Sequence, residues 1–157
     1  MRKHFRVLLL ASIALLPTAL AQDAMPEGVD VVVTLTNVES VAWVVTAVQV
    51  AEGVEAADVA ELDVRNPTLT LTPGLRYRFD NNGGAAHPLD FRKKNARFLL
   101  AQGNVPGSLE DDEAVDFVDD AEGVTFTLTP ELAEDLALYY CTVHPDMVGD
   151  IVTGAAE

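Results

Sequence analysis

The sequence predicts an all-β protein, an antiparallel β-sandwich with little helix. Three observations support this fold class. Several short runs are rich in β-branched residues, some runs alternate apolar and polar residues with period two, and Gly, Pro and Asn turn signals separate the runs. The chain has 157 residues, of which 49% are hydrophobic. This length suits one domain, and this composition supplies enough apolar side chains for a core.

The expected strands follow one another from residue 31 onward. They cover residues 31–38, 42–50, 68–72, 75–80, 88–91, 124–128, 136–141 and 150–153. The first two are rich in Val and Thr, and the fourth places three apolar residues on one face and three charged residues on the other.

The connections between these strands are less regular. Residues 51–64 are compatible with a loop that contains one helical turn, and residues 92–123 are expected to be irregular. A short helix or turn is expected after Thr129, which is a suitable N-cap, with Pro130 at the first helical position.

The N-terminus has the composition of a secretory signal peptide covering residues 1–21. Three basic residues precede an apolar run at 7–16, and Ala-Leu-Ala at 19–21 is a small-residue cleavage site. The alternative is an anchor that stays attached, but the apolar run is shorter than the about 20 residues that a span needs. We therefore expect an exported protein, periplasmic or extracellular, without stable membrane insertion. Residues 22–29 would form a flexible tail, and residues 30–157 the domain.

The charge excludes nucleic acid as a partner. The formal net charge is −15, and removal of the leader leaves 7 basic against 25 acidic residues, or −18. Phosphate recognition needs clustered Lys and Arg. The acidic run at 110–122 is either a solvated face or a surface that steers a basic partner. The basic cluster at 92–97 is expected to pair with this acidic run.

Three metal-donor side chains lie within one short segment, CTVHPDM at 141–147. Cys141 is the only cysteine, so no intramolecular disulfide can form, and His144 and Met147 follow it at spacings of three. His87 follows the Asn/Gly turn at the end of an earlier strand. Because loops at one end of a sandwich come together, we expect these four side chains to meet.

Two imidazoles, one thiolate and a thioether favour copper over other metals. Zinc also accepts Cys and two His, but a thioether is a poor zinc ligand, and structural zinc sites usually use several Cys. Simpler interpretations remain for each residue alone, since a single Cys or Met is often core filler and a single His is often structural or on the surface. The joint occurrence of all four donors favours a metal site.

The same residues carry a resemblance to a known family. The chain resembles the cupredoxins, small blue (type 1) copper proteins that include plastocyanin and amicyanin, over residues 66–74 (NPTLTLTPG), 78–82 (RFDNN), His87 and 138–152. The Cys-x-x-His-x-x-Met spacing is most similar to amicyanin. The resemblance implies a Greek-key sandwich that binds one copper ion, cycling between Cu(I) and Cu(II), through His87, Cys141, His144 and Met147.

The sequence departs from the family pattern in two places. The family often has Asn directly after the first His ligand, where it joins the two ligand loops by hydrogen bonds. Pro88 occupies that position and has neither a backbone N–H nor a polar side chain, so these loops must be joined differently. The segment 92–123 is also longer and more charged than a minimal cupredoxin connection.

Taken together, these features predict a monomeric electron carrier rather than an enzyme, exchanging single electrons with a donor and an acceptor protein. His144 is expected near the surface within an apolar rim. The rim would comprise Ala85, Ala86, Pro145, Met147 and Val148. Tyr140 is expected to point away from Cys141, either as a second electron port or as an ordinary outward aromatic residue.

Three other functions stay open at this point. The same ligands would serve a copper storage or delivery protein, for which an exchange-competent site is needed. A copper enzyme would need further histidines, and none remain in residues 22–157 after one site is built. A metal-free adhesion or scaffold sandwich would not depend on Cys141.

Overall fold

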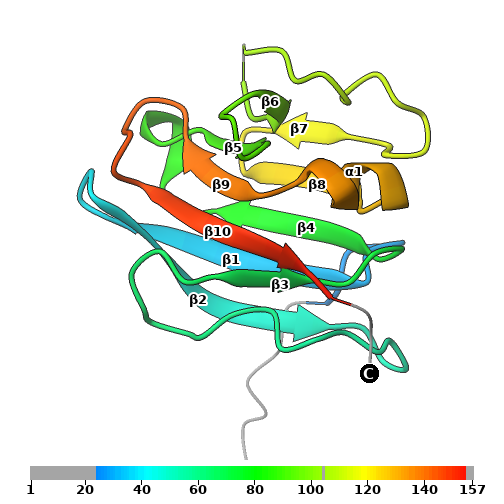
Figure 1. Cartoon of the computed structure of the whole chain (residues 1–157). Helices are drawn as coiled ribbons and strands as arrows, with labels where there is room; N and C mark the ends of the chain where they lie inside the picture. The colour runs from blue at the N-terminus through cyan, green and yellow to red at the C-terminus, as the bar shows by residue number, and fades with distance from the viewer. Residues whose placement is uncertain (1–23, 104, 155–157) are drawn as a thin grey trace, which may run out of the picture.

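The chain folds into two β-sheets that pack face to face, as the sequence predicted (Figure 1). The computed structural model describes residues 24–103 and 105–154, so the predicted leader and the start of the predicted tail lie outside the described residues. Within the described ranges, no helix has both the length and the apolar character needed to cross a membrane.

The first sheet has the strand order β2-β1-β4-β8-β7. Its strands are β1 (Val31–Val38), β2 (Ala42–Val50), β4 (Arg76–Asn81), β7 (Val118–Asp120) and β8 (Gly123–Thr127). β1 and β4 are parallel, and the other neighbours in this sheet are antiparallel.

The second sheet has the order β3-β10-β9-β5-β6. Its strands are β3 (Leu69–Leu71), β5 (Leu89–Arg92), β6 (Phe98–Ala101), β9 (Leu138–Cys141) and β10 (Val148–Thr153). β3 and β10 are parallel. Both sheets are therefore mixed, whereas the sequence predicted antiparallel ones. Each parallel pair joins strands that are distant in the sequence, where no tight hairpin imposes an antiparallel arrangement.

Aromatic side chains from both sheets form the centre of the core. Phe79 of β4 packs against Phe91 of β5 with ring centroids 5.0 Å apart, and against Phe126 of β8 at 5.6 Å. Tyr77 and Trp43 are likewise fully buried. The alternation predicted for residues 75–80 is confirmed at its apolar positions, since Tyr77 and Phe79 both face inward.

The connections confirm some expectations and correct others. Helix α1 (Pro130–Asp135) begins as predicted, with Thr129 Oγ1 accepting a hydrogen bond from Leu132 N at 3.1 Å. Residues 51–64 contain turns but no helix. The segment 92–123 is less irregular than expected, because it contains β6 and β7.

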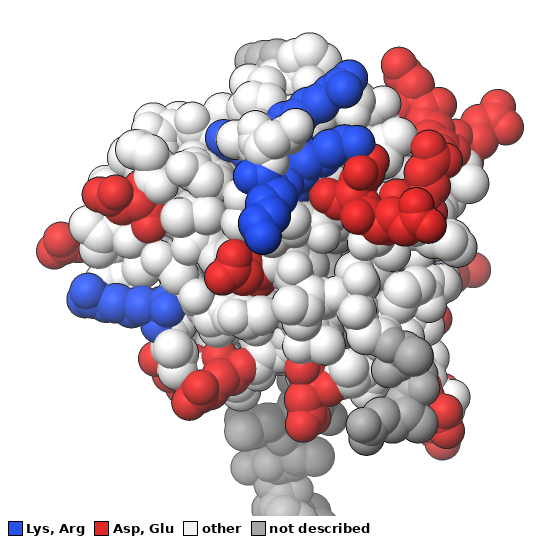
Figure 2. Space-filling view, viewed as in Figure 1, with Lys and Arg blue, Asp and Glu red and all other residues white. Residues whose placement is uncertain are grey.

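The charged surface pairs differently from the prediction. Figure 2 shows Lys and Arg side chains gathered on one part of the visible face with carboxylates beside them. The members of the basic cluster that form ion pairs do so outside the acidic run, Arg92 with Asp90 and Lys93 with Asp135. The acidic run instead binds arginines of β4, Asp116 to Arg76 and Asp120 to Arg78. The expected pairing of residues 92–97 with residues 110–122 is therefore wrong for these contacts.

Candidate metal site

The four predicted donors meet at one end of the sandwich. His87 Nδ1 lies 3.2 Å from Met147 Sδ and 3.9 Å from Cys141 Sγ, and Cys141 Sγ lies 3.5 Å from His144 Nδ1. The nitrogen and sulfur donor atoms of His87, Cys141 and His144 all lie within 4.8 Å of one another. We call these four residues the donor cluster.

Three members of the donor cluster come from the short segment 141–147, which we call the donor loop. Cys141 ends β9, and Met147 directly precedes β10. The loop is closed by its own backbone, since Cys141 N donates to Met147 O at 2.9 Å and Met147 N donates to His144 O at 3.1 Å. Antiparallel pairing of β9 with β10 fixes the two ends of the loop, so local structure brings the three side chains to the same side.

His87 reaches the donor cluster from a different part of the chain. It follows the 3-10 turn Gly84–Ala86, and its N–H donates to Gly84 O at 2.9 Å. The side chain of Asn81 makes two hydrogen bonds to the segment that carries His87. Asn81 Nδ2 donates to His87 O at 2.8 Å, and Asn81 Oδ1 accepts from Gly83 N at 2.9 Å. Side-chain hydrogen bonds therefore contribute to the position of His87.

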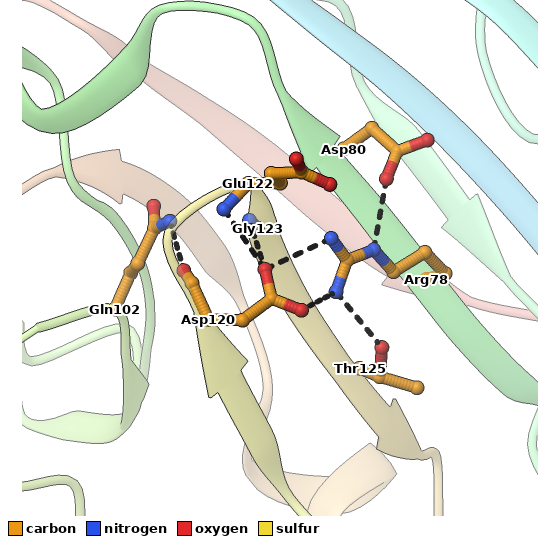
Figure 3. Close-up of polar contacts among 7 residues, drawn as sticks. All are labelled: Arg78, Asp80, Gln102, Asp120, Glu122, Gly123 and Thr125. Atoms are coloured by element: carbon orange, nitrogen blue, oxygen red, sulfur yellow. Dashed lines mark hydrogen bonds and ion pairs between the residues drawn. The ribbon is translucent and has the colours of Figure 1, made fainter.

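A chain of hydrogen bonds extends from Asn81 toward the charged face. Asn81 Nδ2 also donates to Gln102 Oε1 at 2.7 Å, and Gln102 Nε2 donates to the backbone oxygen of Asp120 at 3.0 Å. The Asp120 carboxylate binds Arg78 through both of its oxygens, at 2.7 and 3.0 Å, and accepts from the N–H groups of Glu122 and Gly123 (Figure 3). The burial of Asn81 and Gln102 makes these bonds structurally important, because an unpaired buried amide is costly.

Burial of the donor cluster is uneven. Cys141 and Met147 are 1% and 0% exposed, His87 is 8% exposed, and His144 is only half-buried. His144 therefore lies near the surface, as predicted. Met147 does not belong to an exposed apolar rim, which corrects that expectation, whereas Pro145 beside it is exposed.

The surroundings of His87 favour its neutral form. Burial lowers the pKa of His87, and the charge of His144 lowers this pKa further. The two imidazole rings are 4.6 Å apart between centroids, and the edge of Trp43 faces His87 at 6.3 Å. Since a metal binds neutral imidazole, a lowered pKa reduces proton competition at neutral pH.

The opposite ring nitrogen of His87 contacts a residue that sequence reasoning did not identify. His87 Nε2 lies 3.3 Å from Asn37 Nδ2, and Asn37 also donates to Glu39 O at 2.8 Å. Nε2 is thus directed toward β1, and Nδ1 is the nitrogen available at the donor cluster. The Asn37 NH2 group can donate to Nε2 only in the tautomer whose proton is on Nδ1, whereas a metal bound at Nδ1 requires the proton on Nε2, so this contact belongs to the metal-free ring.

The distances and the donor chemistry both fit a bound metal ion. Two donors about 2.0 to 2.3 Å from one ion are separated from each other by roughly 3 to 4 Å. The three donor–donor distances of 3.2, 3.5 and 3.9 Å lie in this range. Two imidazole nitrogens, a thiol and a thioether form a soft, mixed donor set that matches copper better than Mg²⁺ or Ca²⁺.

Sequence reasoning found the four donors but missed the residues that hold them. Asn66 donates from Nδ2 to Asp146 O at 3.2 Å and accepts from Trp43 N at 2.8 Å, so it links the donor loop to β2. Its backbone φ of 47° lies in the left-handed region that Asn tolerates. In the sequence, the pair Asn66-Pro67 indicates a turn, but it does not indicate that Asn66 contacts the donor loop.

Comparisons with protein-family models, with curated proteins and with solved structures gave no match. The assignment of function therefore depends on the donor cluster and its surroundings.

Proposed function

We propose that this protein is a cupredoxin-like, type 1 (blue) copper protein that carries single electrons between redox partners and is not an enzyme. The observation that supports this proposal most strongly is the convergence of His87, Cys141, His144 and Met147 at one end of a β-sandwich, where three pairs of donor atoms lie 3.2 to 3.9 Å apart. Two imidazoles, one thiolate and a weak axial thioether form the ligand set of blue copper centres.

Copper bound at the donor cluster would supply a one-electron couple, and the protein would supply a fixed geometry. An electron carrier works best when its ligands move little between oxidation states. Cys141 and Met147 are buried and joined by a backbone hydrogen bond. The backbone of His87 is fixed by Asn81. A cage of this kind keeps the cost of rearrangement low because a packed interior resists displacement.

His144 offers the shortest route between the donor cluster and solvent. It is the half-buried member of the donor cluster, while Cys141 and Met147 are buried. A partner that approaches exposed Pro145 and Ala86 would come close to the His144 ring. Such contacts suit the small, brief interfaces of redox proteins.

The proposal is tested by copper titration of the chain. We expect an intense visible thiolate-to-copper charge-transfer band, a narrow copper hyperfine splitting and a reversible one-electron reduction. Cys141→Ser should abolish the band and the narrow splitting. Met147→Leu should keep the colour and shift the reduction potential, while the matched control Met25→Leu, distant in sequence from the donor loop, should leave both unchanged.

Two outcomes would contradict the proposal. A colourless chain that binds zinc in preference to copper would identify a zinc site. Rapid, complete transfer of copper to an acceptor, without reversible redox behaviour, would identify a copper storage or delivery protein that uses the same ligands.

A further inference from the structure

A buried carboxylate, that of Asp90, contacts the residue next to Cys141, and the proposed function assigns it no role. Asp90 is the second residue of β5, and its side chain is fully buried. It faces away from the aromatic core, since its neighbours Leu89 and Phe91 are the residues of β5 in the core cluster. Burying a carboxylate is costly unless charged or polar groups compensate for the loss of water.

Arg92 provides the first compensation and holds the carboxylate in one orientation. Arg92 Nε and one terminal nitrogen donate to the two oxygens of Asp90 at 2.6 and 2.8 Å. The guanidinium itself lies against the rings of Phe98 and Tyr140, 4.1 and 4.0 Å from their centroids. Bidentate pairing and stacking on two rings fix Arg92, so they also fix the Asp90 oxygens.

Thr142 provides the second compensation, and it belongs to the donor loop. Thr142 Oγ1 donates to Asp90 Oδ2 at 2.9 Å. Thr142 directly follows Cys141, so this bond attaches the donor loop to β5 one residue away from the thiol. Asp90 is itself three residues from His87, so the bond joins the two segments that carry the donors.

The backbone explains why a side-chain bond is needed at this point. The last residue pair of the β5–β9 ladder is Leu89 with Cys141. Beyond this pair, Thr142 N donates a single backbone hydrogen bond to Pro88 O at 3.0 Å. Pro88 has no N–H to return a bond to Thr142. The Thr142 hydroxyl bond to Asp90 therefore supplies a second attachment where the ladder can form only one.

We propose that Asp90 is a positioning residue, oriented by Arg92, that holds Cys141 and the start of the donor loop in place through the hydroxyl of Thr142. The inference deepens the proposed copper function and rests on it for its effect on the metal. The attachment itself exists in the metal-free protein and is measurable there.

The decisive variants differ in one hydroxyl group. Thr142→Val removes the hydroxyl and keeps the β-branched shape, whereas Thr142→Ser keeps the hydroxyl. We expect Thr142→Val to release copper about tenfold faster, in line with the loss seen when groups that orient metal ligands are removed, and to shift the charge-transfer band and the reduction potential. Thr142→Ser should behave like the original protein.

A second variant tests the carboxylate. Asp90→Asn has nearly the same shape but replaces one acceptor oxygen by a donor, so Arg92 and Thr142 compete for fewer acceptors. We expect Asp90→Asn to release copper faster than the original protein, as Thr142→Val does. The control is Thr153→Val on β10, whose hydroxyl contacts Ala133 O at 3.5 Å, and which should leave copper release unchanged.

Amide hydrogen exchange of the metal-free chain separates this inference from the proposed function. Thr142→Val should increase exchange at residues 141–142 more than Thr153→Val does, whether or not copper binds. If the wild-type chain binds no copper but this exchange difference is present, the proposed function fails and the attachment stands. If Thr142→Val matches Thr142→Ser in exchange and in copper release, the positioning role of Asp90 is refuted.

Discussion

The donor loop and the His87 segment reach the same point by different means. The donor loop brings three side chains from seven consecutive residues and closes with backbone hydrogen bonds. The His87 segment brings one side chain and is held by the amide of Asn81, which reaches Gln102 in turn. The donor loop also has tertiary side-chain contacts, through Asn66 and Thr142, but its three donors are close in the sequence, whereas the single donor His87 depends on the fold to reach them.

The largest effect is expected from breaking the backbone support of the donor loop. Gly149 lies on β10, two residues after Met147, and an added Cβ would lie 2.2 Å from the ring of Tyr139. Tyr139 is fully buried and donates to Pro67 O, so it has no room to move. We expect Gly149→Ala to lower the free energy of unfolding by about 3 kcal/mol, measured by urea unfolding of the metal-free chain.

Gly154→Ala is the matched control for this substitution. Its added Cβ would meet only Thr70 Cγ2, at an ordinary contact distance of 3.5 Å. Equal stability of the two variants would show that Tyr139 can move away from the added Cβ, contrary to the close packing of β10 against it.

A smaller and more local effect is expected on the His87 side. Asn81→Ala removes the donor to His87 O and the acceptor for Gly83 N. Unpaired buried groups cost about 1–3 kcal/mol each, so the free energy of unfolding should fall by about 2 kcal/mol, and copper affinity should fall about tenfold. Amide exchange should increase at residues 83–87 and stay unchanged at residues 143–147 of the donor loop.

Asn82→Ala provides the comparison, because Asn82 is the exposed neighbour of Asn81. It should leave stability and copper affinity unchanged. Increased exchange at residues 143–147 of Asn81→Ala would show that Asn81 supports the donor loop as well as the His87 segment.

The smallest effect is expected at the far end of the Asn81 network. The hydrogen bond from Arg78 lowers the pKa of Asp120 below its usual value, and backbone N–H groups add to this shift. A lowered pKa in the folded state stabilises the fold above the unfolded pKa near 4, and this stability is lost as the pH falls through the folded pKa. Asp120→Asn should therefore be less stable than the original at pH 7 and equally stable at the acid end.

The size of this effect is limited by solvent. The Asp120 side chain is 47% exposed, so the loss at pH 7 should stay below about 1 kcal/mol. Urea midpoints at pH 7 and at low pH measure it, with the exposed Asp111→Asn as the control. A difference between Asp120→Asn and the original that persists at low pH would indicate a packing role instead.

The sequence was informative where a local pattern was sufficient. The strands at 31–38 and 42–50 were predicted with their observed bounds, and the four donors followed from residue type and spacing. β7 was missed because all three of its residues are exposed and two are aspartates, a composition typical of a loop. The parallel pairs were missed because partners distant in sequence leave no local signal.

The residues that support the site could not be predicted from the sequence either. Asn81 and Asn82 are identical neighbours in the sequence, yet one is buried against His87 and the other is exposed. Only the three-dimensional fold distinguishes them. Asp90 gives a similar example, since an acidic residue within a predicted strand was not expected to be fully buried.

The place of β10 in the second sheet has a consequence for the order of events during folding. This last strand lies between β3 and β9, and its pairing with β3 joins segments from the middle and the end of the chain. Because β10 also forms one side of the donor loop, through its pairing with β9, the four donors can come together only after the last described strand has joined the second sheet.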